Sequence, residues 1–191
     1  MLSNYPFEYI EHMIPVSVHK ITFHPPSRSY AVILKEIEND RSLPVIVGSF
    51  EAQSIALAME HAESPRPLTH DLIRSLIQEI ESKLTAVKIT DLIDGVFYAR
   101  MEIKGKLVGD RSLDARPSDA IVIALRMDAP ILVDDAVMKE VGVLDEDIAK
   151  DVKEVSHSIQ KHLEEQLVKA VEVEDYERAA VIRDKIKELS I

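Results

Sequence analysis

The chain has 191 residues, of which 46% are hydrophobic and 30% are charged, as in ordinary globular proteins. It contains no cysteine, which excludes disulfide bonds, thiolate zinc sites and cysteine nucleophiles. The N-terminal segment is acidic, and no stretch approaches the ~18 apolar residues that span a bilayer, so we expect a cytoplasmic protein without a membrane segment. The net charge of −11 argues against tight, metal-independent binding of nucleic acid, because an acidic chain repels a polyanion.

The first part of the chain predicts three strands and a helix. Apolar and polar residues alternate over residues 14–23, and two further β-rich runs follow at 30–37 and 43–47. A helix is expected to begin at Gly48–Ser49, with Glu51 in its first turn, where the macrodipole favours a carboxylate. Its predicted apolar face consists of Ala52, Ile55, Ala56, Met59 and Ala62.

The middle of the chain predicts a second helix and a β-hairpin. Thr69 is a good N-cap for the helix. Asp94 and Gly95 separate two β-rich runs, 86–93 and 96–103, at the spacing of a two-residue type I′ turn. A short strand is expected near 106–109. The predicted apolar stripe of the helix consists of Leu72, Ile73, Leu76, Ile77 and Ile80.

The last part of the chain separates into two regions. A third helix is expected to begin at Arg116–Pro117, since proline is accepted in a first turn, and a buried strand follows at 130–133. From Leu144 onwards the composition is charged and helical. We therefore predict two domains, residues 1–150 and residues 151–191. The first is an α+β domain with a mixed sheet and packed helices, and the second is an α-helical hairpin.

Three clusters of polar residues lie where predicted elements meet. Helix N-termini present free N–H groups and positive potential, so clusters at helix starts are candidate anion sites. Each cluster also has a purely structural interpretation, as a helix cap, an ion pair or a solvated side chain. The patterns GxSxG, HExxH, GxGxxG and the P-loop are absent, and we expect no organic cofactor. The clusters consist of Glu60; of Arg66, His70 and Asp71; and of Asp114, Arg116, Ser118 and Asp119.

Four blocks of sequence stand out, namely Glu51–Glu60, Arg66–Leu72, Asp94–Ala99 and Asp114–Ile121. These blocks resemble the bifunctional nuclease family, occur in the family's order and lie within about residues 13–145. The resemblance implies an α+β domain, a homo-oligomer, and nuclease activity on both RNA and DNA.

The C-terminal segment is similar to a UVR motif, with the characteristic core YERAAVIRDKI. We expect two antiparallel helices whose apolar stripes face each other, the first carrying Leu163, Leu167 and Val171. An isolated hairpin of this length is marginally stable, so its stripe is expected to meet a partner. In excision-repair proteins such motifs pair subunits. The facing residues of the second helix are Tyr176, Ala179, Ile182, Ile186 and Leu189.

Two functions remain open from the sequence. In the first, the protein is a metal-assisted phosphodiesterase acting on RNA or DNA, with His70 as general acid or base and Glu60 assisting. Phosphate would be bound by Arg66, Arg116 and Ser118, and a Mg or Mn ion by Asp71, Asp114 and Asp119. In the second, it is a non-catalytic oligomeric adaptor whose UVR-like hairpin recruits a DNA-repair or stress-response partner. The two are distinguished by whether the polar clusters converge.

Overall fold

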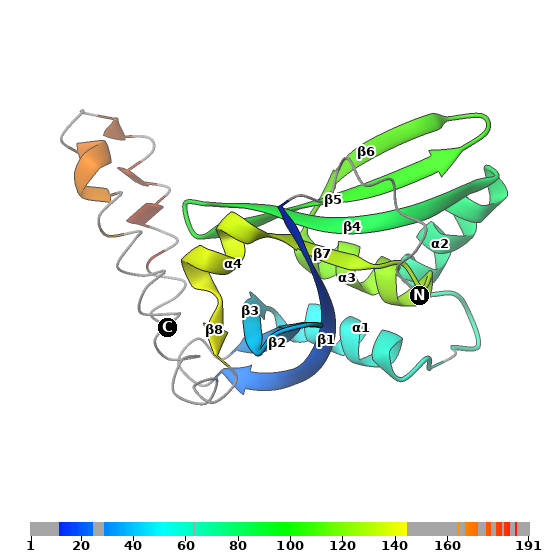
Figure 1. Ribbon diagram of the computed structural model, residues 1–191, viewed down its shortest axis with the longest axis horizontal. Coiled ribbons are helices and arrows are strands. Elements are labelled where there is room, and N and C mark those ends of the chain that lie inside the picture. The colour runs from blue at the N-terminus through cyan, green and yellow to red at the C-terminus, as the bar shows by residue number, and fades with distance from the viewer. Residues whose placement is uncertain are drawn as a thin grey trace.

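The computed structural model describes residues 12–24, 29–62 and 64–144, and within the C-terminal segment residues 164, 167–171, 175–176, 179–180, 182–183 and 186. Residues 12–144 form one mixed sheet of eight strands and four helices, which confirms the predicted α+β class. The strand order is β6-β5-β4-β7-β1-β2-β3-β8 (Figure 1). In the part of the chain that the structure describes, no helix is long and apolar enough to cross a bilayer.

One half of the sheet is an antiparallel meander of β1 (Met13–His24), β2 (Ser29–Glu36) and β3 (Arg41–Val47). These strands confirm the three runs expected from the sequence. Their inward residues are apolar and almost completely buried, so this half supplies one wall of the core. The two-residue strand β8 (Val143–Leu144), which the sequence did not reveal, pairs with the beginning of β3 and forms that edge of the sheet.

The other half is a second antiparallel meander of β4 (Ser82–Ile93), β5 (Val96–Gly105) and β6 (Gly109–Ala115). Asp94 and Gly95 form the predicted turn between β4 and β5, with φ angles of 52° and 72°, the left-handed values that a type I′ turn requires. The strand β7 (Ile131–Asp134) joins the two halves, lying parallel to β4 and antiparallel to β1. The sheet is therefore continuous although its halves are far apart in sequence.

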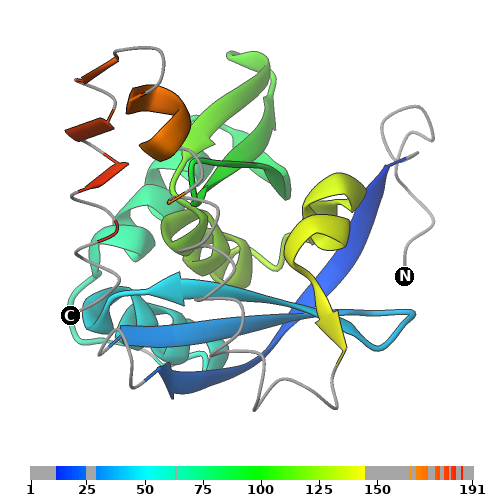
Figure 2. The same cartoon turned by 90° about the vertical axis from the view of Figure 1, so that its left-hand side faces the viewer.

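Helix α3 (Pro117–Arg126) lies at the centre of the molecule. Every residue from Pro117 to Ala124 is buried except Asp119, because the helix is apolar around nearly its whole circumference. Figure 2 shows it between the blue strands β1–β3 and the green strands β4–β6. Helix α1 (Ser49–Met59) and helix α2 (Thr69–Glu79) pack against it, and α4 (Asp135–Val141) follows β7. The sheet thus bends around one helix.

Most of the predicted apolar stripe of α2 is not covered by the fold. Only Ile77 is buried, whereas Leu72, Leu76 and Ile80 are exposed. The helix contacts the rest of the described fold mainly through α3 and β4, so only a narrow side of it is covered. The predicted N-cap is also displaced by one residue, since Leu68 is the N-cap and Thr69 is the first helical residue.

The strand expected near 106–109 is wrongly placed. Residues 106–108 form a turn with Leu107 80% exposed, and β6 begins only at Gly109, which has φ +68°. β6 is an edge strand whose residues are almost all exposed, so its sequence lacks the apolar alternation that reveals half-buried strands.

In the C-terminal segment, the described residues other than Asp175 are helical, and five of them form a small apolar cluster. Val171 and Tyr176 were expected in it but are exposed, and Ala170 takes the inward position instead. Leu163 and Leu189 lie outside the described residues, as does the domain boundary near residue 150, which stays a prediction. The cluster consists of Leu167, Ala170, Ala179, Ile182 and Ile186, with Val143 against it.

A buried carboxylate stabilises the end of the β2–β3 hairpin. Glu36 is 6% exposed, and Arg41 donates to it from Nε at 2.7 Å and from Nη2 at 3.2 Å. Asn39 donates a third bond at 2.7 Å. The hydrogen bond from Arg41 lowers the pKa of Glu36 and outweighs burial, which raises it. Loss of either partner would leave a poorly compensated charge.

We expect Arg41→Ala to lower the free energy of unfolding by about 2 kcal/mol at pH 7, because hydrogen bonds to a buried charge are lost. Glu36 has a lowered folded pKa, so its stabilisation is present above the unfolded value and disappears as the pH falls through the folded value. The difference between the variant and the wild type should therefore shrink towards pH 3. Urea unfolding at both pH values measures it, with the exposed Arg111→Ala as the control; equal losses for both variants would contradict the prediction.

Candidate functional site

The first turns of three helices meet at one group of side chains. Arg116, the N-cap of α3, donates to Asp119 from Nε at 2.8 Å and from Nη2 at 3.1 Å. Its Nη1 is 3.4 Å from Oε1 of Glu51, in the first turn of α1. The Nε2 of His70, in the first turn of α2, is 3.2 Å from Oδ1 of Asp119. We call Glu51, His70, Arg116 and Asp119 the helix-start cluster.

Local sequence fixes how these helices begin. Pro117 is the first residue of α3, where its missing N–H costs nothing and its fixed φ suits a helix. Gly48 is the N-cap of α1, and a Cβ there would lie 2.5 Å from a carboxylate oxygen of Glu51. Glycine therefore leaves room for the Glu51 side chain beside its own helix start, within reach of Arg116.

Asp119 is the electrostatic centre of the cluster. Burial raises the pKa of Asp119, but hydrogen bonds from Arg116 and then His70 outweigh it, and the pKa lies below its ordinary value. The same hydrogen bond raises the pKa of Arg116. Asp119 is therefore ionised at neutral pH. The Arg116 side chain is 66% exposed, so its attraction to Asp119 is partly screened by water.

His70 has the geometry of an oriented acid or base. Its side chain is 18% exposed, and its Nε2 faces the carboxylate of Asp119. When Nε2 carries the proton, this contact fixes the tautomer and leaves Nδ1 as the basic nitrogen. A histidine held by a carboxylate beside an accessible arginine can move a proton next to a bound anion.

A groove opens beside the cluster. Its volume is about 470 Å³, and its polar lining comes from Glu51, Arg116 and Ser118. Most of the remaining wall is apolar, and Phe97 supplies an aromatic ring. This volume is within the usual range of small-molecule sites. The rest of the lining consists of Val45, Ile46, Val47, Gly48, Gly95, Val96 and Pro117.

Asp71 belongs to a different contact. Its Oδ2 accepts the backbone N–H of Leu68 at 3.0 Å, as a first-turn acid does in a capping interaction. Its Oδ1 is 3.3 Å from Nε of Arg126, whose buried Nε makes no hydrogen bond, so the contact is an ion pair alone. The Nη1 of Arg126 donates to the Ala62 carbonyl at 2.9 Å. No motif in the sequence indicated this role for Arg126.

Three other predicted residues lie away from the cluster. Asp114 is exposed on β6, opposite Arg100 in the register. Glu60 is the exposed C-cap residue of α1, and Arg66 is exposed in the segment between α1 and α2. Within the described ranges, none of the three has a hydrogen bond or ion pair with the cluster. The structure thus brings together His70, Arg116 and Asp119, with Ser118 at the adjoining groove.

The residues expected to hold a divalent ion do not form one site. Among the described residues, no three histidines or acidic side chains are grouped as metal ligands. The carboxylates of Asp71 and Asp119 instead contact arginines, and Asp114 lies on β6. The three predicted ligands are therefore not gathered at one point, and the Mg or Mn ion itself stays a prediction.

Glu51 is the member of the cluster that sequence reasoning missed. It was interpreted only as a carboxylate favoured by the macrodipole in a first turn. Its place at the start of a block that resembles the nuclease family was the available signal.

Comparison with known proteins identifies two regions. The family model of the bifunctional nuclease domain matches residues 32–146, and that of the UvrB/uvrC motif matches residues 158–191. An uncharacterized protein of Mycobacterium tuberculosis is 44% identical over 131 residues, which are 68% of this chain and 76% of the relative. Bifunctional nuclease 1 of Oryza sativa subsp. indica is 31% identical over 107 residues, 54% of this chain and 32% of the relative. Bifunctional nuclease 2 of Arabidopsis thaliana is 30% identical over 108 residues, again 54% and 32%.

We expect Arg116→Ala to raise the pKa of Asp119, because the variant removes the hydrogen bonds that oppose burial. Arg116→Lys should raise it less, since lysine keeps the charge but not the two-pronged geometry. Carboxyl-carbon NMR titration measures the change. Asp135 is the internal control, because its lowered pKa depends on Lys139 and Arg41 and should not move. An unchanged Asp119 would show that Arg116 does not set its ionisation.

Proposed function

Because the chain belongs to the bifunctional nuclease domain family, we propose that it cleaves phosphodiester bonds in RNA and DNA at the helix-start cluster. The observation that carries this proposal is the contact of His70 and Arg116 with one carboxylate, Asp119, at the edge of a groove. Plant relatives named bifunctional nucleases support the reaction class.

Each residue of the cluster has a distinct task in this reaction. His70 takes a proton from a water molecule, whose oxygen attacks phosphorus while the bond to the leaving sugar oxygen breaks. The proton then passes from His70 to that leaving oxygen. Arg116 has five N–H donors, of which three contact Asp119 and Glu51, so others are available for the phosphate oxygens. Asp119 orients both side chains.

The groove supplies the place for a nucleoside next to the scissile phosphate. Phe97 offers a face for base stacking, which tolerates any base and suits an enzyme acting on RNA and DNA alike. Ser118 and Glu51 provide hydrogen-bonding groups at the rim nearest Arg116. A site of this kind recognises the phosphate and one base without reading a sequence.

The expected result is that His70→Ala lowers the cleavage rate of a labelled oligonucleotide by at least ~100-fold, as removal of a general acid–base does. The matched control is His19→Ala, an exposed histidine on β1. Arg116→Lys should mainly raise KM, with the exposed Arg111→Lys as its control.

The same assay with Mg, Mn and EDTA tests the ion expected from the sequence, which stays a separate prediction. Loss of cleavage in EDTA together with full activity of His70→Ala would replace the histidine mechanism with a carboxylate-bound metal. Cleavage that is unaffected both by His70→Ala and by EDTA would contradict the histidine mechanism and the metal mechanism, and would favour the adaptor function.

The UVR-like region supports a second, compatible role in protein contact. The UvrB/uvrC motif covers residues 158–191. Beside its small buried cluster, Val168, Val171 and Tyr176 are 57%, 49% and 66% exposed, an apolar surface on a helical segment. We propose that this surface binds a partner protein in DNA repair or in a stress response.

The core domain is also proposed to form a homo-oligomer in which α2 of one copy packs against α2 of another. The exposed residues Leu72, Leu76 and Ile80 recur at every fourth position and form one stripe. In an antiparallel pair, Arg74 of one copy would lie near Glu79 of the other, which adds charge complementarity. Both side chains are exposed.

We expect the full-length Leu76→Glu variant to form a smaller oligomer, or a monomer, because the substitution places a charge at the centre of the buried stripe. Leu107→Glu is the control, since Leu107 is 80% exposed on the β5–β6 turn. Light scattering after size-exclusion chromatography measures the mass. A wild-type monomer, or equal masses for all three proteins, would contradict this interface.

A further inference from the structure

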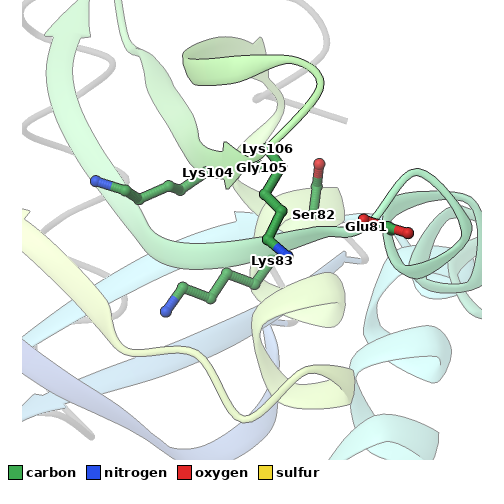
Figure 3. Close-up of a pocket in the computed structure, with 6 residues that line it drawn as sticks. All are labelled: Glu81, Ser82, Lys83, Lys104, Gly105 and Lys106. Atoms are coloured by element: carbon green, nitrogen blue, oxygen red, sulfur yellow. The ribbon is translucent and has the colours of Figure 1, made fainter.

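A second pocket lies at the end of the β4–β5 hairpin opposite the Asp94–Gly95 turn. Its volume is about 400 Å³. Lys83 and Lys104 are direct partners in the register of β4 and β5, so their side chains extend from the same face of the sheet (Figure 3). Lys106 completes a set of three lysines. We call this the lysine pocket; its other lining residues are Glu81, Ser82 and Gly105.

The charges in the lysine pocket are poorly compensated by the fold. Like charges directly opposite on neighbouring strands are unfavourable, yet Lys83 faces Lys104. Lys104 has one ion pair, 3.4 Å from Asp110, but both side chains are more than 60% exposed and the pair is weak. In the described part of the chain, Lys83 and Lys106 have no ion pair with an acidic side chain. A bound anion would relieve this repulsion.

The floor of the pocket depends on a glycine. Gly105 is paired with Ser82, and a Cβ at Gly105 would overlap the Ser82 hydroxyl group. Ser82 is 9% exposed and its hydroxyl donates to the Ile80 carbonyl at 3.2 Å, so it is held in place. Ser82 and Gly105 face the opposite side of the hairpin from Lys83 and Lys104, so the glycine allows the two strands to approach closely beneath the lysines.

Positive charge is concentrated on this hairpin. Residues 82–115 carry six lysines and arginines and five acidic residues, which gives this segment a net charge of +1. Because the whole chain has a net charge of −11, the remaining residues together carry −12. Lys88 and Arg100 are also direct partners and lie between the lysine pocket and the turn. The groove beside Arg116 is lined by Val96 and Phe97, at the other end of β5. Cations thus lie along the hairpin from one pocket to the other, with Glu102 among them, 3.6 Å from Lys88.

We propose that the lysine pocket binds a backbone phosphate of the nucleic-acid strand whose cleavage takes place at the helix-start cluster, an inference that rests on the proposed function. β5 has ten residues and so is about 33 Å long. A strand of several nucleotides held in the groove can follow the hairpin to the pocket, whereas a dinucleotide cannot. The pocket contributes affinity for long substrates and no chemistry.

The test compares Lys83→Gln/Lys106→Gln with the charge-matched control Lys20→Gln/Lys139→Gln, whose lysines are exposed on β1 and α4. Binding of the full chain to a fluorescent 12-nucleotide single strand is measured by anisotropy over a range of salt concentrations. We expect the pocket variant to bind about tenfold more weakly at low salt. The slope of log K against log salt should fall in magnitude by about 0.7, for one lost phosphate contact on a single strand. The control should bind as the wild type does.

Cleavage of a dinucleotide separates this inference from the proposed function. It should be unchanged in the pocket variant, because that substrate is too short to reach the lysines. Wild-type binding without any cleavage would defeat the proposed catalysis and leave the pocket supported. If the pocket variant and the control variant bound the oligonucleotide equally weakly, the loss would come from the total charge of the protein and not from the pocket, which would overturn the inference.

Two further outcomes would overturn it. A polyglutamate peptide that competes as well as an oligonucleotide would assign the pocket to an acidic protein segment. A melting temperature of the pocket variant below that of the wild type would show that the lysines stabilise the fold. We expect an equal or higher melting temperature, because the variant removes the repulsion between Lys83 and Lys104.

Discussion

The burial of α3 is the constraint on which the rest of the structure depends. A helix that is apolar on every side must be surrounded, and here two antiparallel meanders and two helices enclose it. The strand that follows it, β7, returns between the meanders and joins them into one sheet. Asp119 is the one residue between Pro117 and Ala124 that is not buried, so its carboxylate is directed to the place where α1 and α2 begin. The position of the site thus follows from the packing of the core.

The two arginine–carboxylate contacts of the fold differ in a way that matters for function. Glu36 is buried and triply hydrogen-bonded, so separating it from Arg41 would cost a large share of the stability of a small domain. Arg116 is two-thirds exposed, and exposed ion pairs contribute only about 0–1 kcal/mol. A phosphate can therefore compete for Arg116 at little energetic cost. The first pair maintains the fold, and the second is free to exchange partners.

The parts of the fold with strong local signals could be predicted from the sequence. The Asp94–Gly95 turn requires positive φ at both residues, and Pro117 is accepted in the first turn of a helix but not in its interior, so both were located correctly. The helix α2 and its apolar stripe were also predicted, but a stripe does not reveal whether a partner covers it, and Leu72, Leu76 and Ile80 are exposed. The cluster joins His70 to Asp119 across 49 positions, and no local pattern specifies such a contact. Polarity alone did not distinguish Asp119 from Asp71 and Asp114, which long-range packing placed elsewhere.

The acidic composition and the nucleic-acid substrate are compatible once distance is considered. Screening at physiological ionic strength limits charge interactions to about 8 Å, so a bound phosphate responds to the side chains around it and little to the total charge. The β4–β6 meander carries a net charge of +1 while the remainder carries −12. Along the hairpin a polyanion meets the paired cations Lys83 with Lys104 and Lys88 with Arg100. An uneven charge distribution can thus select one orientation of the nucleic-acid strand, with the groove at one end and the lysine pocket at the other. The protein as a whole does not have to be basic for this.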